Sequence, residues 1–222
     1  MDSKVRFTPE LAAQVAESDT SSTAAAPVAA APASLARPPR DVPRRLTHTR
    51  EVVCRGYERE DGLWEIEGSL LDTKTYPFHT VHRGHIPAGE GIHRMTLRLT
   101  VDDELVIRDA QALTEQSPYR VCREVNAAYD GLIGLRIGPG FTRRVKEMFA
   151  GVKGCTHLTE LLGPVATTAF QTIWPLLAER REAAGQGLSG EEKPPLVDGC
   201  HALSRDGEVV AMRWSAEVRA RW

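Results

Sequence analysis

The spacing of apolar residues changes once along this chain, near Pro118, and that change constrains the fold more than any other feature. Before it, apolar and polar residues alternate. The stretch His93–Val101 reads HRMTLRLTV, which places every second residue on one side. Such alternation predicts a half-buried β-strand. Three further ranges predict strands and complete an antiparallel meander of three or four strands: Leu46–Arg59, Leu63–Leu71 and Glu104–Leu113.

After Pro118 the apolar residues recur every three or four positions, which is the spacing of an amphipathic helix. Three ranges predict helices: Tyr119–Leu135, Phe141–Phe149 and Thr156–Ala184. Pro164 and Pro175 should kink or split the last of them, because proline removes a helix hydrogen bond. Strands followed by helices predict an α+β fold in which the helices pack on one face of the sheet.

The beginning of the chain differs in composition from the rest. Between Ala24 and Pro39, twelve of sixteen residues are Ala or Pro. Such a segment has no apolar face to bury, so we predict a disordered tail over residues 1–45 and a single α+β domain over residues 46–222. Within the domain, Tyr76–Gly91 is predicted as a long loop, and Val209–Trp214 as a short strand.

Charge and composition narrow the function classes. There are 28 Lys and Arg against 30 Asp and Glu, a formal net charge of -2. This balance argues against bulk nucleic-acid binding, which requires a basic surface. No apolar run of about 18 residues is present, so no membrane-spanning helix is expected. The first 20 residues lack the apolar core of a secretory signal, which favours a cytoplasmic protein with reduced cysteines. Binding to a partner protein is compatible with this composition.

Two cysteines carry the strongest chemical signal. Cys122 and Cys155 are each predicted in the first turn of a helix, with Glu124 and His157 two residues further on. The amide groups at a helix start stabilise a thiolate, the species that ligates metals or attacks electrophiles. Cys122, Glu124, Cys155 and His157 are chemically sufficient to hold zinc or an iron–sulfur species. The alternative is that both cysteines are small buried residues that pack the helix starts.

Other polar groups give weaker signals. His79, His82 and His85 have the spacing of a metal tract, but in an extended loop their imidazoles do not converge. Asp72 and Lys74 form a pair suited to proton transfer, although solvated charges on a strand give the same pattern. Cys54 lies on a predicted strand among apolar residues and is expected in the core.

Several short motifs resemble a bacterial domain family of unknown function. The resemblance covers residues 46–215 and implies no activity. It rests on five stretches: His48-Thr-Arg, Cys54-Arg-Gly-Tyr57, Asp61-Gly-Leu-Trp64-x-Ile-Glu-Gly68, Asp72-Thr-Lys74 and Gly154-Cys-Thr-His-Leu-x-Glu-Leu161.

A second, remote resemblance is to the U-type iron–sulfur cluster scaffold proteins, over residues 47–180. In that family a first cysteine follows the last strand and precedes an aspartate by two residues, which Cys122 and Glu124 match. A last cysteine opens the C-terminal helix, as Cys155 does. The family's middle cysteine has no equivalent here, and its ligand histidine precedes the cysteine, whereas His157 follows it. The resemblance therefore implies a shared fold more than a shared activity.

Three functions follow from these observations. The first is a metal-binding or iron–sulfur scaffold-like module built on the two cysteines. The second is a cysteine-dependent enzyme of small-molecule metabolism with Cys155 as nucleophile. Residues two apart on a helix lie on different faces, so its base is expected elsewhere, at His93 or His201. The third is an interaction or assembly factor without catalysis.

Overall fold

The computed structural model describes residues 43–186, 193–194 and 196–222. Residues 1–42 of the predicted disordered tail lie outside the described residues. Residues Arg45–Trp222 form one unit, which contains the sheet and the helices.

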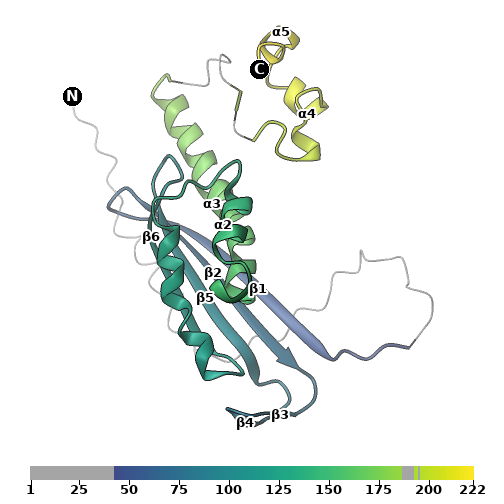
Figure 1. The fold of residues 1–222 in the computed structure, drawn as a ribbon. Helices are drawn as coiled ribbons and strands as arrows, with labels where there is room; N and C mark the ends of the chain where they lie inside the picture. Colours follow the sequence, from purple (N-terminus) through teal and green to yellow (C-terminus); the bar gives the residue numbers. More distant parts are fainter. Residues whose placement is uncertain (1–42, 187–192, 195) are drawn as a thin grey trace, which may run out of the picture. The chain divides into compact units, whose positions relative to one another are not determined.

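A four-stranded antiparallel sheet forms the first half of this unit (Figure 1). Its strands lie in the order β1 (His48–Glu58), β2 (Trp64–Lys74), β5 (Gly91–Val101) and β6 (Ile107–Gln116). The predicted meander and the α+β class are confirmed. The last strand begins three residues later than predicted, because Asp102 Oδ1 accepts hydrogen bonds from the N–H groups of Glu104 (3.0 Å) and Val106 (2.8 Å) and holds them in a turn.

The stretch Tyr76–Gly91 is not the loop that its Pro, Gly and His content predicts. It contains a small separate hairpin, β3 (Phe78–Thr80) and β4 (Gly84–Ile86), in which His79 is paired with His85. The prediction failed because three-residue strands are too short to show alternation. Gly84, at φ +68°, supplies the left-handed residue that starts the returning strand.

The helical half differs from its prediction in two places. Tyr119–Leu135 is not one α-helix but two 3₁₀ segments, η1 (Arg120–Arg123) and η2 (Asn126–Leu132). Only two residues of these segments are buried, Tyr129 and Leu132, and a spacing of three suits the tighter helix. The short helix α2 (Phe141–Met148) is confirmed, and η3 (Gly151–Lys153) follows it.

The long helix α3 (Thr156–Ala183) is continuous, so the predicted split is wrong. Pro164 and Pro175 are both exposed, and so are Glu160 and Gln171, whose carbonyl groups lose a helix donor to these prolines. Water can satisfy those carbonyls on the outer face while the apolar stripe stays intact. The C-terminal segment forms η4 (His201–Leu203), α4 (Glu208–Ala211) and α5 (Ala216–Arg219), so the predicted strand over Val209–Trp214 is also wrong.

Helix α3 lies across one face of the sheet and closes the core, as predicted (Figure 1). It contacts β1, β2 and β5, and its buried residues share one stripe: Leu158, Leu161, Leu162, Val165, Ala169, Ile173 and Leu177. Length and composition alone would let α3 cross a bilayer. Its stripe is instead buried on the sheet, as in a core helix of a soluble domain. The cytoplasmic location stays a prediction.

Close packing of α3 on the middle of the sheet depends on Gly68. A Cβ atom at this position would lie 2.4 Å from Val165 Cγ2. We expect Gly68→Ala to lower the free energy of unfolding by about 1–2 kcal/mol, because the overpacked side chains must shift. Chemical denaturation measures this. Combining it with Val165→Ala should cost less than the two single changes added together. Gly163→Ala on the open side of α3, where nothing lies within 4 Å, is the matched control and should not destabilise.

Candidate functional site

One end of the core face is polar. On β2 and β5 the alternation that buries Leu70 and Met95 continues to Asp72 and His93, which therefore face the helix layer. Asp72 is the partner of His93 on one side and of Arg50 on the other. Three neighbouring strands thus place one polar side chain each in a single row, and the first turn of α3 lies over it.

Asp72 is the centre of this row and is only 1% exposed. Arg50 donates to both carboxylate oxygens, from Nε to Oδ1 and from Nη2 to Oδ2, each at 2.8 Å. His93 Nδ1 lies 2.9 Å from Oδ2, and His48 Nε2 lies 3.3 Å from Oδ1. A carboxylate has about four lone-pair positions, and Arg50, His93 and His48 make four contacts with Asp72 within 3.3 Å.

Asp72 is ionised at neutral pH. Burial alone would raise its pKa, but the hydrogen bonds and charge of Arg50, with the contact to His93, lower the pKa to about 2. Arg50 also donates from Nη1 to Glu160 Oε2, at 2.5 Å, and so joins the strand row to the first turns of α3. The guanidinium between these two carboxylates compensates the buried negative charge.

His93 and His157 stack on one another beside Asp72. Their ring centroids lie 3.8 Å apart, with 29° between the ring planes. Burial lowers the pKa of both imidazoles. The pKa of His93 is lowered further by its electrostatic interaction with His157, and the pKa of His157 is lowered further by the charge of Arg50. Both are therefore neutral at pH 7. His93 then donates Nδ1–H to Asp72, and its Nε2 is the ring nitrogen that can accept.

Cys155 and His157 face each other. Cys155 Sγ lies 3.9 Å from His157 Nδ1, and the other ring nitrogen, Nε2, lies 3.6 Å from Asp72 Oδ2. The expectation that residues two apart cannot face each other is wrong here. Cys155 is not in the first turn but precedes α3 as its N-cap, with extended backbone angles of φ -98° and ψ 129°. Helical spacing therefore does not apply to this pair.

Tyr129 fixes the backbone of Cys155 from inside the core. The Tyr129 hydroxyl accepts from the Cys155 N–H at 3.0 Å and lies 2.9 Å from the Cys155 carbonyl oxygen. It also lies 2.8 Å from Thr159 Oγ1. Tyr129 is fully buried and stacks on Phe149 at 4.3 Å between centroids. The thiol is consequently held by residues that cannot easily move.

The residues of this polar site all fall within one protein-family match. The model of a protein family of unknown function, DUF2889, matches residues 48–171. The chain belongs to the DUF2889 family. The matched range contains all seven residues of the polar site: His48, Arg50, Asp72, His93, Cys155, His157 and Glu160. Comparison with curated proteins and with solved structures finds no match.

The DUF2889 fold brings together only two of the four ligands predicted from sequence, Cys155 and His157. Cys122 lies in η1, and Glu124 is its C-cap residue. Within the described residues, no hydrogen bond or ion pair joins either of them to the polar site. A ligand set that includes Cys122 and Glu124 thus stays a prediction, as does the iron–sulfur scaffold resemblance. Cys54 is half-buried against the core, and burial raises the pKa of its thiol.

A different set of possible metal ligands is present in the DUF2889 site. One ligand atom each from Asp72, His93 and His157 lies within 4.8 Å of the other two. Two features oppose a tetrahedral ion in this arrangement. Imidazoles on such an ion have ring centroids about 5 Å apart, whereas these two stack at 3.8 Å. Asp72 moreover already accepts two hydrogen bonds from a cation, Arg50.

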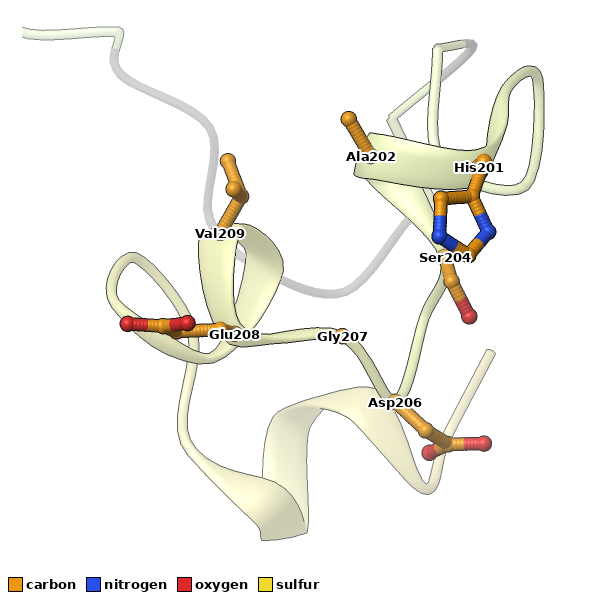
Figure 2. Close-up of a pocket in the computed structure, with 7 residues that line it drawn as sticks. All are labelled: His201, Ala202, Ser204, Asp206, Gly207, Glu208 and Val209. Atoms are coloured by element: carbon orange, nitrogen blue, oxygen red, sulfur yellow. The ribbon is translucent and has the colours of Figure 1, made fainter.

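His201, the other predicted base, lies elsewhere in the DUF2889 chain. It lines a hollow of about 380 Å³ on the C-terminal segment, together with Asp206 and Glu208 (Figure 2). In Figure 2 these three side chains point in different directions, and no hydrogen bond joins them within the described residues. This hollow contains no residue of the polar site.

The sequence patterns identified most residues of the polar site without assembling them. In the sequence, Asp72 pairs with Lys74 either for proton transfer or as solvated charges, His93 is a candidate base, and Arg50 and His48 stand only in a motif. The signal that could have joined them was the strand alternation. Asp72 and His93 continue the apolar positions of β2 and β5, and a charged residue on a core-facing position requires a partner.

Proposed function

We propose that this domain is an enzyme that uses Cys155 as its nucleophile, His157 as general base and Asp72 as the carboxylate that orients the base. One observation supports it above the others: a single imidazole has a thiol at one nitrogen, 3.9 Å away, and a buried carboxylate at the other, 3.6 Å away. Nucleophile, base and orienting group in that order are the components of covalent catalysis.

The proposed step is acyl transfer. His157 Nδ1 takes the Cys155 thiol proton while the sulfur forms a bond to the substrate carbonyl carbon. The leaving group departs with that proton, and water or a second acceptor then releases the acyl group from sulfur. Asp72 remains ionised throughout, since its pKa of about 2 lies far below neutral pH, and it stabilises the imidazolium that forms.

The start of α3 supplies a second element that acyl transfer needs. The first hydrogen bond within this helix runs from the Thr159 N–H to the Cys155 carbonyl, at 2.9 Å. The amides of Thr156, His157 and Leu158 therefore have no acceptor within the helix. Amide groups at a helix start, together with the helix dipole, stabilise negative charge on a thiolate or on a carbonyl oxygen.

Alkylation of the native protein by iodoacetamide tests the proposal. We expect Cys155 to react at least about tenfold faster at pH 7 than the exposed Cys200, which gives the rate of an ordinary thiol. His157→Ala should lower the rate of Cys155 itself, because the base is lost, whereas His201→Ala should leave the rate of Cys155 unchanged. Site-resolved mass spectrometry measures both rates. A Cys155 rate equal to that of Cys200, or unchanged in His157→Ala, would contradict the proposal.

A metal centre is the second candidate, because three ligand atoms of Asp72, His93 and His157 lie within 4.8 Å of one another. In this candidate the ion would be zinc or another transition metal, as expected for the metal-binding, scaffold-like module that the sequence predicts. Elemental analysis of aerobically and anaerobically purified protein tests it. Loss of metal in His93→Ala would support a site made of Asp72, His93 and His157. Loss of metal in Cys122→Ser would support the ligand set predicted from the sequence, which includes Cys122. Less than about a tenth of an equivalent in both preparations would exclude both sets, since structural metals bind tightly.

A further inference from the structure

A second hollow, of about 450 Å³, lies where the turn between β3 and β4 meets the end of β6 and η1. We call it the arginine hollow, because Arg83, Arg120 and Arg123 line it. His82 and Tyr119 also line it and contact each other edge to face, with ring centroids 5.8 Å apart. This contact joins the hairpin turn to the segment that leads into η1. The volume of the arginine hollow suits a small molecule.

The three arginines differ in how many of their donors are used. Arg83 is fixed: it donates to the carbonyl oxygens of Gly91 (2.8 Å) and Ile92 (3.3 Å) and pairs with Glu90. Arg123 donates once, to the Glu115 carbonyl oxygen at 2.9 Å. Within the described residues, Arg120 has no hydrogen-bond or ion-pair partner. Two guanidinium groups on one short segment therefore have donors to spare.

The wall of the hollow includes a side chain with an acceptor that has no donor. Gln116 lines it, and its Oε1 atom is buried with no hydrogen-bond partner among the described residues. A buried polar atom left unpaired is energetically unfavourable, so such an atom calls for a partner. Gly91 makes room for this amide, because a Cβ atom there would lie 2.0 Å from Oε1. The acidic residues nearby are Glu90, paired with Arg83, and Glu115, whose carboxylate forms no ion pair in the described part of the chain.

We infer that the arginine hollow binds a small metabolite that carries an oxyanion, with Arg120 and Arg123 on the oxyanion and the Gln116 amide turned toward the ligand, so that a hydroxyl or amino group donates to its Oε1 atom. A planar guanidinium donates two parallel hydrogen bonds to a carboxylate or to a phosphate, so both sources of the oxyanion fit. The inference is independent of the proposed thiol chemistry, since none of these residues belongs to the polar site.

Amide NMR titrations at low ionic strength test the inference, with inorganic phosphate, acetate and glycolate as probes. We expect saturable shifts confined to residues 82–83 and 115–123. If phosphate binds more tightly than acetate, the natural ligand is a phosphorylated molecule. If acetate binds more tightly, the natural ligand is a carboxylate. Arg120→Ala combined with Arg123→Ala should raise the dissociation constant at least about tenfold. Arg144→Ala, an exposed arginine on α2, is the control and should change it less than about twofold.

Glycolate and acetate differ by one hydroxyl group and so test the donor to Gln116. We expect glycolate to bind more tightly than acetate, and the difference to vanish in Gln116→Leu. Absence of saturable shifts with all three probes, or equal binding by the double arginine variant, would overturn the inference. Iodoacetamide labelling of Cys155 in the same variants should be unchanged, so the outcome is separate from that of the proposed function.

Discussion

Replacing Asp72 with asparagine is expected to lower the free energy of unfolding at pH 7 by about 2 kcal/mol, because the solvent-accessible Arg50 loses its bidentate carboxylate partner. The same change should slow alkylation of Cys155 at least about tenfold, since His157 loses the charge that stabilises its protonated form. Chemical denaturation and site-resolved alkylation measure the two effects. Asp130→Asn, at an exposed aspartate, is the matched control.

The pH dependence of stability provides a second readout of Asp72. Its pKa is about 2 in the folded protein, against an ordinary value of 3.8. The unfolded chain therefore binds the proton first as pH falls. A stabilisation of about 2 kcal/mol, fully present above pH 4, should be lost as the pH approaches 2. Asp72→Asn should lack this step. The lowered pKa values of His93 and His157 also reduce stability on acidification, but beginning near pH 6.5. An unaltered step between pH 4 and 2 in the variant would contradict the assignment.

Replacing Tyr129 with phenylalanine is expected to cost about 2 kcal/mol of stability, because the Cys155 N–H and Thr159 Oγ1 lose a buried partner. The ring and its stacking on Phe149 are retained, so the core keeps its packing. The rate of Cys155 alkylation should become less dependent on His157, since the backbone that presents the thiol is released. Denaturation of the single variant and alkylation of Tyr129→Phe/His157→Ala measure these effects.

Tyr119→Phe is the control for that experiment, because Tyr119 is exposed and its ring contact with His82 does not use the hydroxyl. It should match the unaltered protein in both measurements. If Tyr129→Phe leaves both stability and the dependence on His157 unchanged, the hydroxyl does not position Cys155.

Alternation alone determined much of the fold. In β5 it assigned His93, Met95, Leu97, Leu99 and Val101 to one face, and that face is the one that α3 covers. The periodic stripe of α3 was likewise determined locally. These features follow from the sequence because side-chain direction is set by backbone geometry within a few residues.

Only the tertiary structure decided what these residues do together. Asp72 and Lys74 look alike in sequence, as charges on a strand, but Asp72 is buried among Arg50, His48 and His93 because the strand register places it there. The opposition of Cys155 to His157 depended on whether Cys155 begins the helix or precedes it, a shift of one residue. Between Tyr119 and Leu135 the apolar spacing was compatible with two helix types, and packing on β6 selected the 3₁₀ segments. Contacts between distant residues arise from register and packing, which local spacing does not encode.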